Sequence, residues 1–117
     1  MGTRDRDSGD LLQGTLAILL LKALLTGPAH GFGIARWIEA MTDDVLRIEE
    51  GSLYPALRRA EDAGWVTSEW GVSENNRRAR FYSITRKGRT HLQAEATTWL
   101  RYASAVERVL RTSPSLA

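Results

Sequence analysis

Apolar residues recur along much of this chain at the three- and four-residue spacing of amphipathic helices. The first such stretch begins near Asp10 and ends at Leu25, where Gly27 and Pro28 stop it. Its apolar surface is wide, which predicts a helix that is central to the fold or shared between subunits. A second, shorter helix is expected after Gly31. Its apolar residues are Phe32, Ile34, Ala35, Trp37, Ile38 and Met41.

A third helix is predicted from about Ser52 to Ala63. Glu49 and Glu50 precede it, and acidic side chains are favourable at the positive end of a helix dipole. Pro55 is compatible with a first turn, where its missing N–H would have had no partner within the helix. The inner face is expected to consist of Leu53, Leu57, Ala60 and Gly64. The outer face is expected to carry Pro55, Arg58, Arg59 and Asp62, flanked by Ser52 and Tyr54.

Two stretches rich in β-forming residues follow, at 65–70 and 80–85. The segment between them contains Asn75 and Asn76, and Asn tolerates the left-handed backbone of a tight turn. These features predict a β-hairpin. Thr85 is expected to cap a last helix, whose apolar residues alternate in steps of four and three, a spacing that suits a partner helix. They are Leu92, Ala96, Trp99, Ala103, Val106 and Leu110.

The predicted fold is therefore mainly α with a small β-hairpin, in the order of a winged helix-turn-helix followed by a C-terminal dimerisation helix. We expect a flexible tail at 1–10, the winged helix-turn-helix at 11–88 and the dimerisation helix at 89–112. In this architecture the third helix lies in the major groove of DNA and the hairpin flanks it along the backbone.

Composition limits the possible classes of protein. The 117 residues are 43% hydrophobic, which suits one soluble domain or a small domain with an appendage. The chain has no cysteine, which excludes thiol nucleophiles and cysteine zinc sites. The apolar stretch 16–25 is about half of the ~20 residues that a membrane span needs, and Lys22 interrupts it. We expect no membrane contact.

The sequence does not favour an enzyme. It has two histidines, His30 and His91, which are far apart, and it lacks a phosphate-binding glycine loop, a metal-ligand spacing and a nucleophile motif. We therefore expect no cofactor and no metal. A second alternative is a winged helix that serves only as a protein-interaction module.

The charge distribution is more informative than the net charge of +2. The segment 77–89 contains no acidic residue and carries Arg77, Arg78, Arg80, Arg86, Lys87 and Arg89. Such a run is often only a solvated surface, but on a wing it would meet DNA phosphates. Arg58 and Arg59 can each present a planar fork to guanine O6 and N7. Arg59 could instead pair with Asp62, which makes Arg58 the better candidate for reading a base.

Three segments resemble the PadR-like transcriptional regulators: LLQGTLAILLLKALLTGPAHGFGIARWIE, EEGSLYPALRRAEDAGW and NNRRARFYSITRKGR. The resemblance spans about Leu11 to Arg89 and implies a cytoplasmic homodimer that represses transcription at an inverted-repeat operator. It also implies that a bound effector, or a change of expression, releases the DNA. Carried over residue by residue, it assigns DNA contacts to Ser52, Tyr54, Pro55 and Arg58 on the third helix, to Arg77, Arg78 and Arg80 on the wing, and to His30 at a phosphate.

A subunit contact is expected where the C-terminal helix packs on the partner's N-terminal helix. Leaving Trp99 in water would be costly, because burying a large aromatic side chain is worth on the order of 2 to 3 kcal/mol. The alternative is that the last helix folds back on its own domain. Some relatives bind aromatic effectors near this interface, so Trp99 is also the predicted effector contact. The predicted interface residues are Leu11, Leu12, Leu16, Leu92, Ala96, Trp99, Ala103, Val106 and Leu110.

Overall fold

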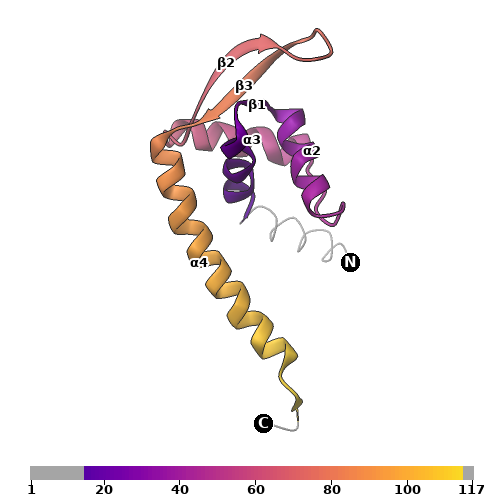
Figure 1. Cartoon of the computed structure of the whole chain (residues 1–117), viewed down its shortest axis with the longest axis vertical. Coiled ribbons are helices and arrows are strands. Elements are labelled where there is room, and N and C mark those ends of the chain that lie inside the picture. Colours follow the sequence, from indigo (N-terminus) through magenta and orange to yellow (C-terminus); the bar gives the residue numbers. More distant parts are fainter. Residues whose placement is uncertain (1–14, 115–117) are drawn as a thin grey trace.

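The computed structural model describes residues 15–114, which form a head and one long projecting helix (Figure 1). A helix over residues 15–23 runs into the short 3-10 helix η1 (Leu24–Thr26). The elements that follow are β1 (Ala29–His30), α2 (Gly31–Met41), α3 (Glu50–Asp62), β2 (Val66–Val72), β3 (Arg78–Ile84) and α4 (Arg86–Arg111). The prediction of a mainly helical winged helix-turn-helix is confirmed. The tail 1–10 lies outside the described residues.

One hydrophobic core joins the helices of the head to the sheet. Its largest fully buried side chains are Leu16, Leu20, Leu21, Leu24, Ile34, Ile38, Leu53, Leu57 and Val66. The helix at 15–23 therefore lies at the centre of the head, as its wide apolar surface indicated. Phe32 and Met41 counted as apolar positions of α2, yet both are exposed.

Two residues expected at the subunit contact are buried within the single chain. Leu16 and Leu92 are 1% and 7% exposed in the single chain, because both pack into the chain's own core. The sequence pattern shows which side of a helix is apolar, but not which neighbour covers it. Leu16 and Leu92 are therefore core residues of the single chain, which leaves little of either side chain exposed for the predicted subunit contact. Leu11 and Leu12, assigned to the same contact, lie outside the described residues.

The hairpin belongs to a three-stranded antiparallel sheet in the order β1-β3-β2 within the described residues. β2 and β3 pair along their whole length, from Val66 opposite Ile84 to Val72 opposite Arg78. Asn76 has a φ of 59°, which agrees with the role expected of an Asn at the tip. The sequence analysis missed β1, since a strand of two residues has no periodicity to detect.

The helix α3 begins earlier than the sequence suggested. Its first backbone bonds run from Ser52 and Leu53 to the Glu49 carbonyl, at 3.0 and 2.9 Å. Pro55 consequently lies in the second turn, where its missing N–H leaves the Gly51 carbonyl without a helical partner. The prediction that Pro55 marks the first turn was wrong. Gly51 is exposed, so water can solvate this carbonyl.

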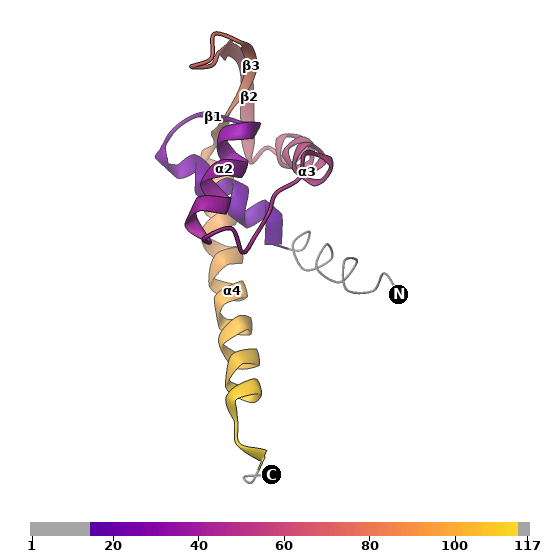
Figure 2. The same cartoon turned by 90° about the vertical axis from the view of Figure 1, so that its right-hand side faces the viewer.

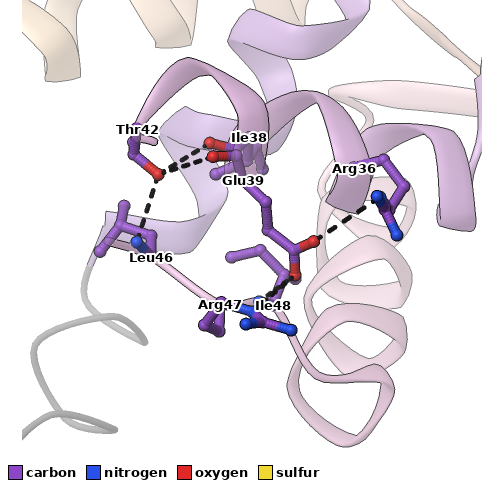
Figure 3. A network of polar contacts seen from close by, with 7 residues as sticks. All are labelled: Arg36, Ile38, Glu39, Thr42, Leu46, Arg47 and Ile48. Carbon is purple, nitrogen blue, oxygen red and sulfur yellow. Dashed lines mark hydrogen bonds and ion pairs between the residues drawn. The ribbon is translucent and has the colours of Figure 1, made fainter. Parts of the chain in front are cut away.

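The connection between α2 and α3 is held at its start by Thr42 (Figure 3). The Thr42 hydroxyl donates to the Ile38 carbonyl at 3.0 Å and accepts the Leu46 N–H at 3.2 Å. Asp43 and Asp44 adopt positive φ angles of 50° and 63°, which turn the chain sharply between these anchors.

Glu39 holds the same connection nearer to α3. Its Oε2 accepts the backbone N–H of Ile48 at 2.9 Å. Arg36 and Arg47 each lie 3.8 Å from this carboxylate, which is only 12% exposed (Figure 3). Ile48 is itself buried, so the segment that enters α3 is fixed by both packing and hydrogen bonding.

Thr85 caps α4, as predicted. Its hydroxyl accepts the Gly88 N–H at 2.9 Å and donates to the Gly64 carbonyl at 2.7 Å. The His91 ring stacks on Trp65 with 3.7 Å between ring centroids. The base of α4 is thus anchored to the turn that follows α3. Beyond Ala96, which packs against the core, α4 projects away from the head (Figure 2).

Candidate nucleic-acid interface

The helix α3 presents its polar face outward, as the sequence predicted. Leu53, Leu57 and Ala60 are buried, together with Ala56. Arg58 and Arg59 are exposed, and no ion pair within residues 15–114 involves either guanidinium. The alternative in which Arg59 pairs with Asp62 is therefore not realised. Ser52, Tyr54 and Pro55 are exposed on the same helix.

An open groove of about 660 Å³ lies between the start of α2 and the wing, which consists of β2, β3 and the loop between them, and Tyr54 is the lining residue that comes from α3. Five of the predicted DNA contacts meet there: His30, Tyr54, Arg77, Arg78 and Arg80. The remaining contacts, Ser52, Pro55, Arg58 and Arg59, do not line this groove and lie on the exposed surface of α3. The other lining residues are Gly31, Phe32, Trp70, Ser73, Glu74, Asn75, Ala79 and Tyr82.

Tyr54 is placed by a close approach to α2. A Cβ atom added to Gly31 would lie 2.7 Å from the Tyr54 hydroxyl oxygen and 2.9 Å from its ring. A larger residue at position 31 would therefore require the Tyr54 ring to move. Tyr54 remains 45% exposed, so one side of the ring stays available to a ligand in the groove.

His30 connects the start of α2 to the wing loop. Its Nδ1 accepts the Gly33 N–H at 3.0 Å, so Nε2 carries the proton in the neutral ring. Nε2 faces a carboxylate oxygen of Glu74 at 3.5 Å. Phe81 packs edge-on against the same ring. The pKa of the Glu74 carboxyl is lowered, mainly by a hydrogen bond with the backbone of Glu74 itself and to a smaller extent by the hydrogen bond with His30.

Trp70 is a groove residue that the sequence analysis did not single out. The Arg78 guanidinium lies 4.7 Å from the Trp70 ring centroid and that of Arg80 lies 5.7 Å away. Trp70 and Arg80 are direct cross-strand neighbours. A hairpin register counted from the tip could have revealed this pairing, but the tip length was not predictable to one residue. Burial raises the pKa of the hydroxyl of Tyr82, another residue that lines the groove.

The basic run 77–89 is divided between two ends of β3. Arg77, Arg78 and Arg80 belong to the wing, whereas Arg86, Lys87 and Arg89 belong to the first turns of α4. The run is therefore not one continuous stripe.

Among residues 15–114, no three His, Asp or Glu side chains gather in a way that could hold a metal ion. In the same part of the chain, no helix has the combined length and apolarity needed to cross a bilayer.

Residues 20–94, more than half of the chain, match the sequence model of the transcriptional regulator PadR-like family. The chain belongs to this family. The matched segment of this PadR-like regulator includes the groove, α3 and the wing, and it ends on α4 just before the helix leaves the head. General regulation of transcription through a winged-helix DNA-binding fold follows from this membership.

Solved structures support the assignment along nearly the full chain. A transcriptional regulator from Clostridium thermocellum is 27% identical, with a TM-score of 0.76 over 85% of this chain and 96% of its own. A PadR family transcriptional regulator from Eggerthella lenta is 29% identical, with a TM-score of 0.73 over 97% and 99%. An uncharacterised protein from Lysinibacillus sphaericus is 22% identical over 98 residues, which are 84% of this chain and 90% of its own.

A second exposed surface of this PadR-like regulator lies on α4. The helix continues the apolar stripe of Leu92 and Ala96, but past the head nothing within the described chain covers it (Figure 1). The alternative in which the last helix folds back on its own domain therefore applies only to its first turns. The large apolar side chains exposed on the projecting part are Trp99, Leu100, Tyr102, Val106, Val109 and Leu110.

Proposed function

We propose that this PadR-like regulator is a homodimeric repressor that binds an inverted-repeat DNA operator. The observation that carries the proposal is the pair of exposed guanidinium groups on α3, Arg58 and Arg59, which form no ion pair within residues 15–114, on the helix that also supplies Tyr54 to the groove lined by the basic wing. The helix would enter the major groove, with Ser52, Tyr54 and Pro55 at its leading end. Arg77 and Arg78 would bind phosphates along the flank, and His30 would reach one more.

The apolar surface of α4 supports the dimer. A row of exposed aromatic and aliphatic side chains along a projecting helix is rarely left in water. The N-terminal helix of a second copy would cover it, with contacts from Ala96, Trp99, Ala103, Val106 and Leu110. A two-fold dimer then matches two half-sites about 10 base pairs apart, centre to centre.

Release by a small aromatic effector is the final part of the proposal. Trp99 is 42% exposed on the surface that the second copy would cover, so its ring could stack on a planar molecule enclosed between the subunits. Occupation of that space would change the spacing of the two α3 helices and so weaken binding to the operator. Quenching of Trp99 fluorescence by such a molecule, measured against Trp99→Phe, tests this part.

Arg58→Ala is expected to relax the base preference at one position in each half-site. The lost bidentate contact should cost about 1 to 3 kcal/mol of discrimination. The measurement is a gel-shift titration on the operator recovered from genomic fragments that the protein binds, together with single-base variants of it. Arg108→Ala, which removes one exposed charge near the end of α4, is the matched control. Equal losses on operator and random duplex would make Arg58 a phosphate contact.

Arg77→Ala is expected to weaken binding to all duplex sequences alike. A phosphate contact releases counterions, so its loss should lower the slope of log affinity against log salt by about 0.9 for each contact, or about 1.8 for a dimer in which both chains carry the substitution. Titrations between low and physiological salt measure this slope. If the protein binds no duplex even at low salt, the result would instead favour the alternative function, a winged helix that recognises only proteins.

A further inference from the structure

Arg80 differs from the other wing arginines because its guanidinium is already held within the chain. Its Nε donates to the Ser68 hydroxyl oxygen at 2.8 Å. The same hydroxyl donates to Oε2 of Glu61 at 2.7 Å. Arg80 Nη2 lies 3.7 Å from that carboxylate oxygen, which closes a triangle of three side chains. We name it the Glu61–Ser68–Arg80 triangle.

The three corners of this triangle come from three different elements. Glu61 lies in the last turn of α3, Ser68 lies on β2 and Arg80 lies on β3. The triangle therefore ties the end of the proposed recognition helix to both strands of the wing. The strands extend well beyond the helices of the head (Figure 2), and the triangle adds a side-chain link to the pairing of β3 with β1 and the packing of β2 against α3, which join the wing to the head.

Arg80 and Arg77 also differ in whether an acidic side chain balances their charge. The Arg80 charge is balanced by Glu61, and its side chain is 45% exposed. Arg77 is exposed and belongs to no ion pair within the described residues. A phosphate at Arg80 would have to displace or share the carboxylate, and the paired charge adds little to counterion release.

Trp70, which lines the groove, contacts Arg80 and links it to Arg78. Both Arg80 and Arg78 lie over its ring, at 5.7 and 4.7 Å from the centroid. An exposed guanidinium on an indole face is attracted by the ring quadrupole. Trp70 thus places Arg78 relative to Arg80, while Arg78 itself forms no ion pair within residues 15–114.

We propose that Arg80 is a positioning residue, and that with Glu61 it sets the angle between the wing and α3 instead of binding a phosphate. The inference rests on the proposed function, since the wing angle matters only if α3 and the wing hold one duplex together. It revises the role that the family resemblance assigned to Arg80. It also gives Glu61, an acidic residue near a DNA-binding surface, a supporting role.

The test compares Arg80→Ala, Glu61→Ala and their double variant with Arg77→Ala as the matched control. Arg80→Ala should weaken duplex binding by about three- to tenfold without changing the salt slope, whereas Arg77→Ala should lower the slope. Glu61→Ala should weaken binding to a similar degree. The double variant should bind no more weakly than either single variant, because the two residues act through one contact.

Two outcomes would overturn the inference. A salt slope that falls in Arg80→Ala as much as in Arg77→Ala would make Arg80 a phosphate ligand. Tighter binding by Glu61→Ala would show that Glu61 only repels DNA, as an unpaired acid would.

A measurement without DNA distinguishes this inference from the proposed function. Amide hydrogen exchange in β2 and β3 of the free protein should accelerate in Arg80→Ala and Glu61→Ala and stay unchanged in Arg77→Ala. If the unmodified protein binds no duplex, the proposed function fails, while the exchange result still decides whether the triangle holds the wing. Unchanged exchange in all three variants would reject the triangle.

Discussion

Gly88→Ala is expected to destabilise this protein strongly. A Cβ atom at this position would overlap the backbone carbonyl oxygen of Trp65 and would lie 2.9 Å from Cγ1 of Ile84. The carbonyl cannot withdraw freely, because it accepts the Thr85 N–H at 2.9 Å. The overlap with the added Cβ atom can therefore be relieved only if the start of α4 moves away from the turn after α3.

The expected cost is on the order of 3 kcal/mol or more, at the upper end for overpacked sites. For a domain of this size it should lower the Tm by about 10 °C or more. Thermal unfolding followed by far-UV circular dichroism measures the change. Gly51→Ala is the matched control, since Gly51 is an exposed helical glycine with nothing within 4 Å of its added Cβ. Equal Tm values for the two variants would show that the junction tolerates rearrangement.

Combining Trp99→Asp with Leu110→Asp should convert the proposed dimer into monomers. Both residues lie on the exposed apolar stripe of α4, and a carboxylate there would lose its hydration in a subunit interface. Light scattering should then report the mass of one chain. Because the two DNA-binding heads are no longer held together, each monomer can occupy only one half-site, and affinity for the operator should fall by about 10²-fold or more.

The control for this experiment places the same charge on the other side of the helix. Thr97→Asp combined with Ser104→Asp adds two carboxylates at exposed positions away from the stripe, at about 100° per residue. This variant should remain a dimer and keep its operator affinity. A dimer mass for the Trp99 and Leu110 variant would place the subunit contact elsewhere, and monomers from both variants would mean that charge alone disrupts it.

Much of the candidate site was predictable because it depends on local rules. The exposure of Arg58 and the burial of Leu57 follow from helical periodicity within α3. The cap by Thr85 follows from a side chain that reaches only three residues ahead. The family segments predict that Tyr54 and Arg78 share one DNA-binding surface, and both residues line the groove.

The contacts that define the wing were not predictable in the same way. Glu61, Ser68 and Arg80 are separated by seven and twelve residues, and they meet only because the strand register aligns them. A shift of the hairpin by one residue would turn Arg80 to the other face of the sheet. The role of Trp70 beneath two guanidinium groups depends on the same register.

By itself, the sequence determined the order of the elements, the polar and apolar faces of the helices and the membership of a family of transcriptional regulators. These properties depend on spacing within single segments and on residue types that a family shares. Only the tertiary structure decided that Leu16 and Leu92 belong to the chain's own core, that β1 completes the sheet, and that Arg80 is paired with Glu61. Each of these outcomes depends on which distant segment packs against a face, and hydrophobic patterning leaves that choice open.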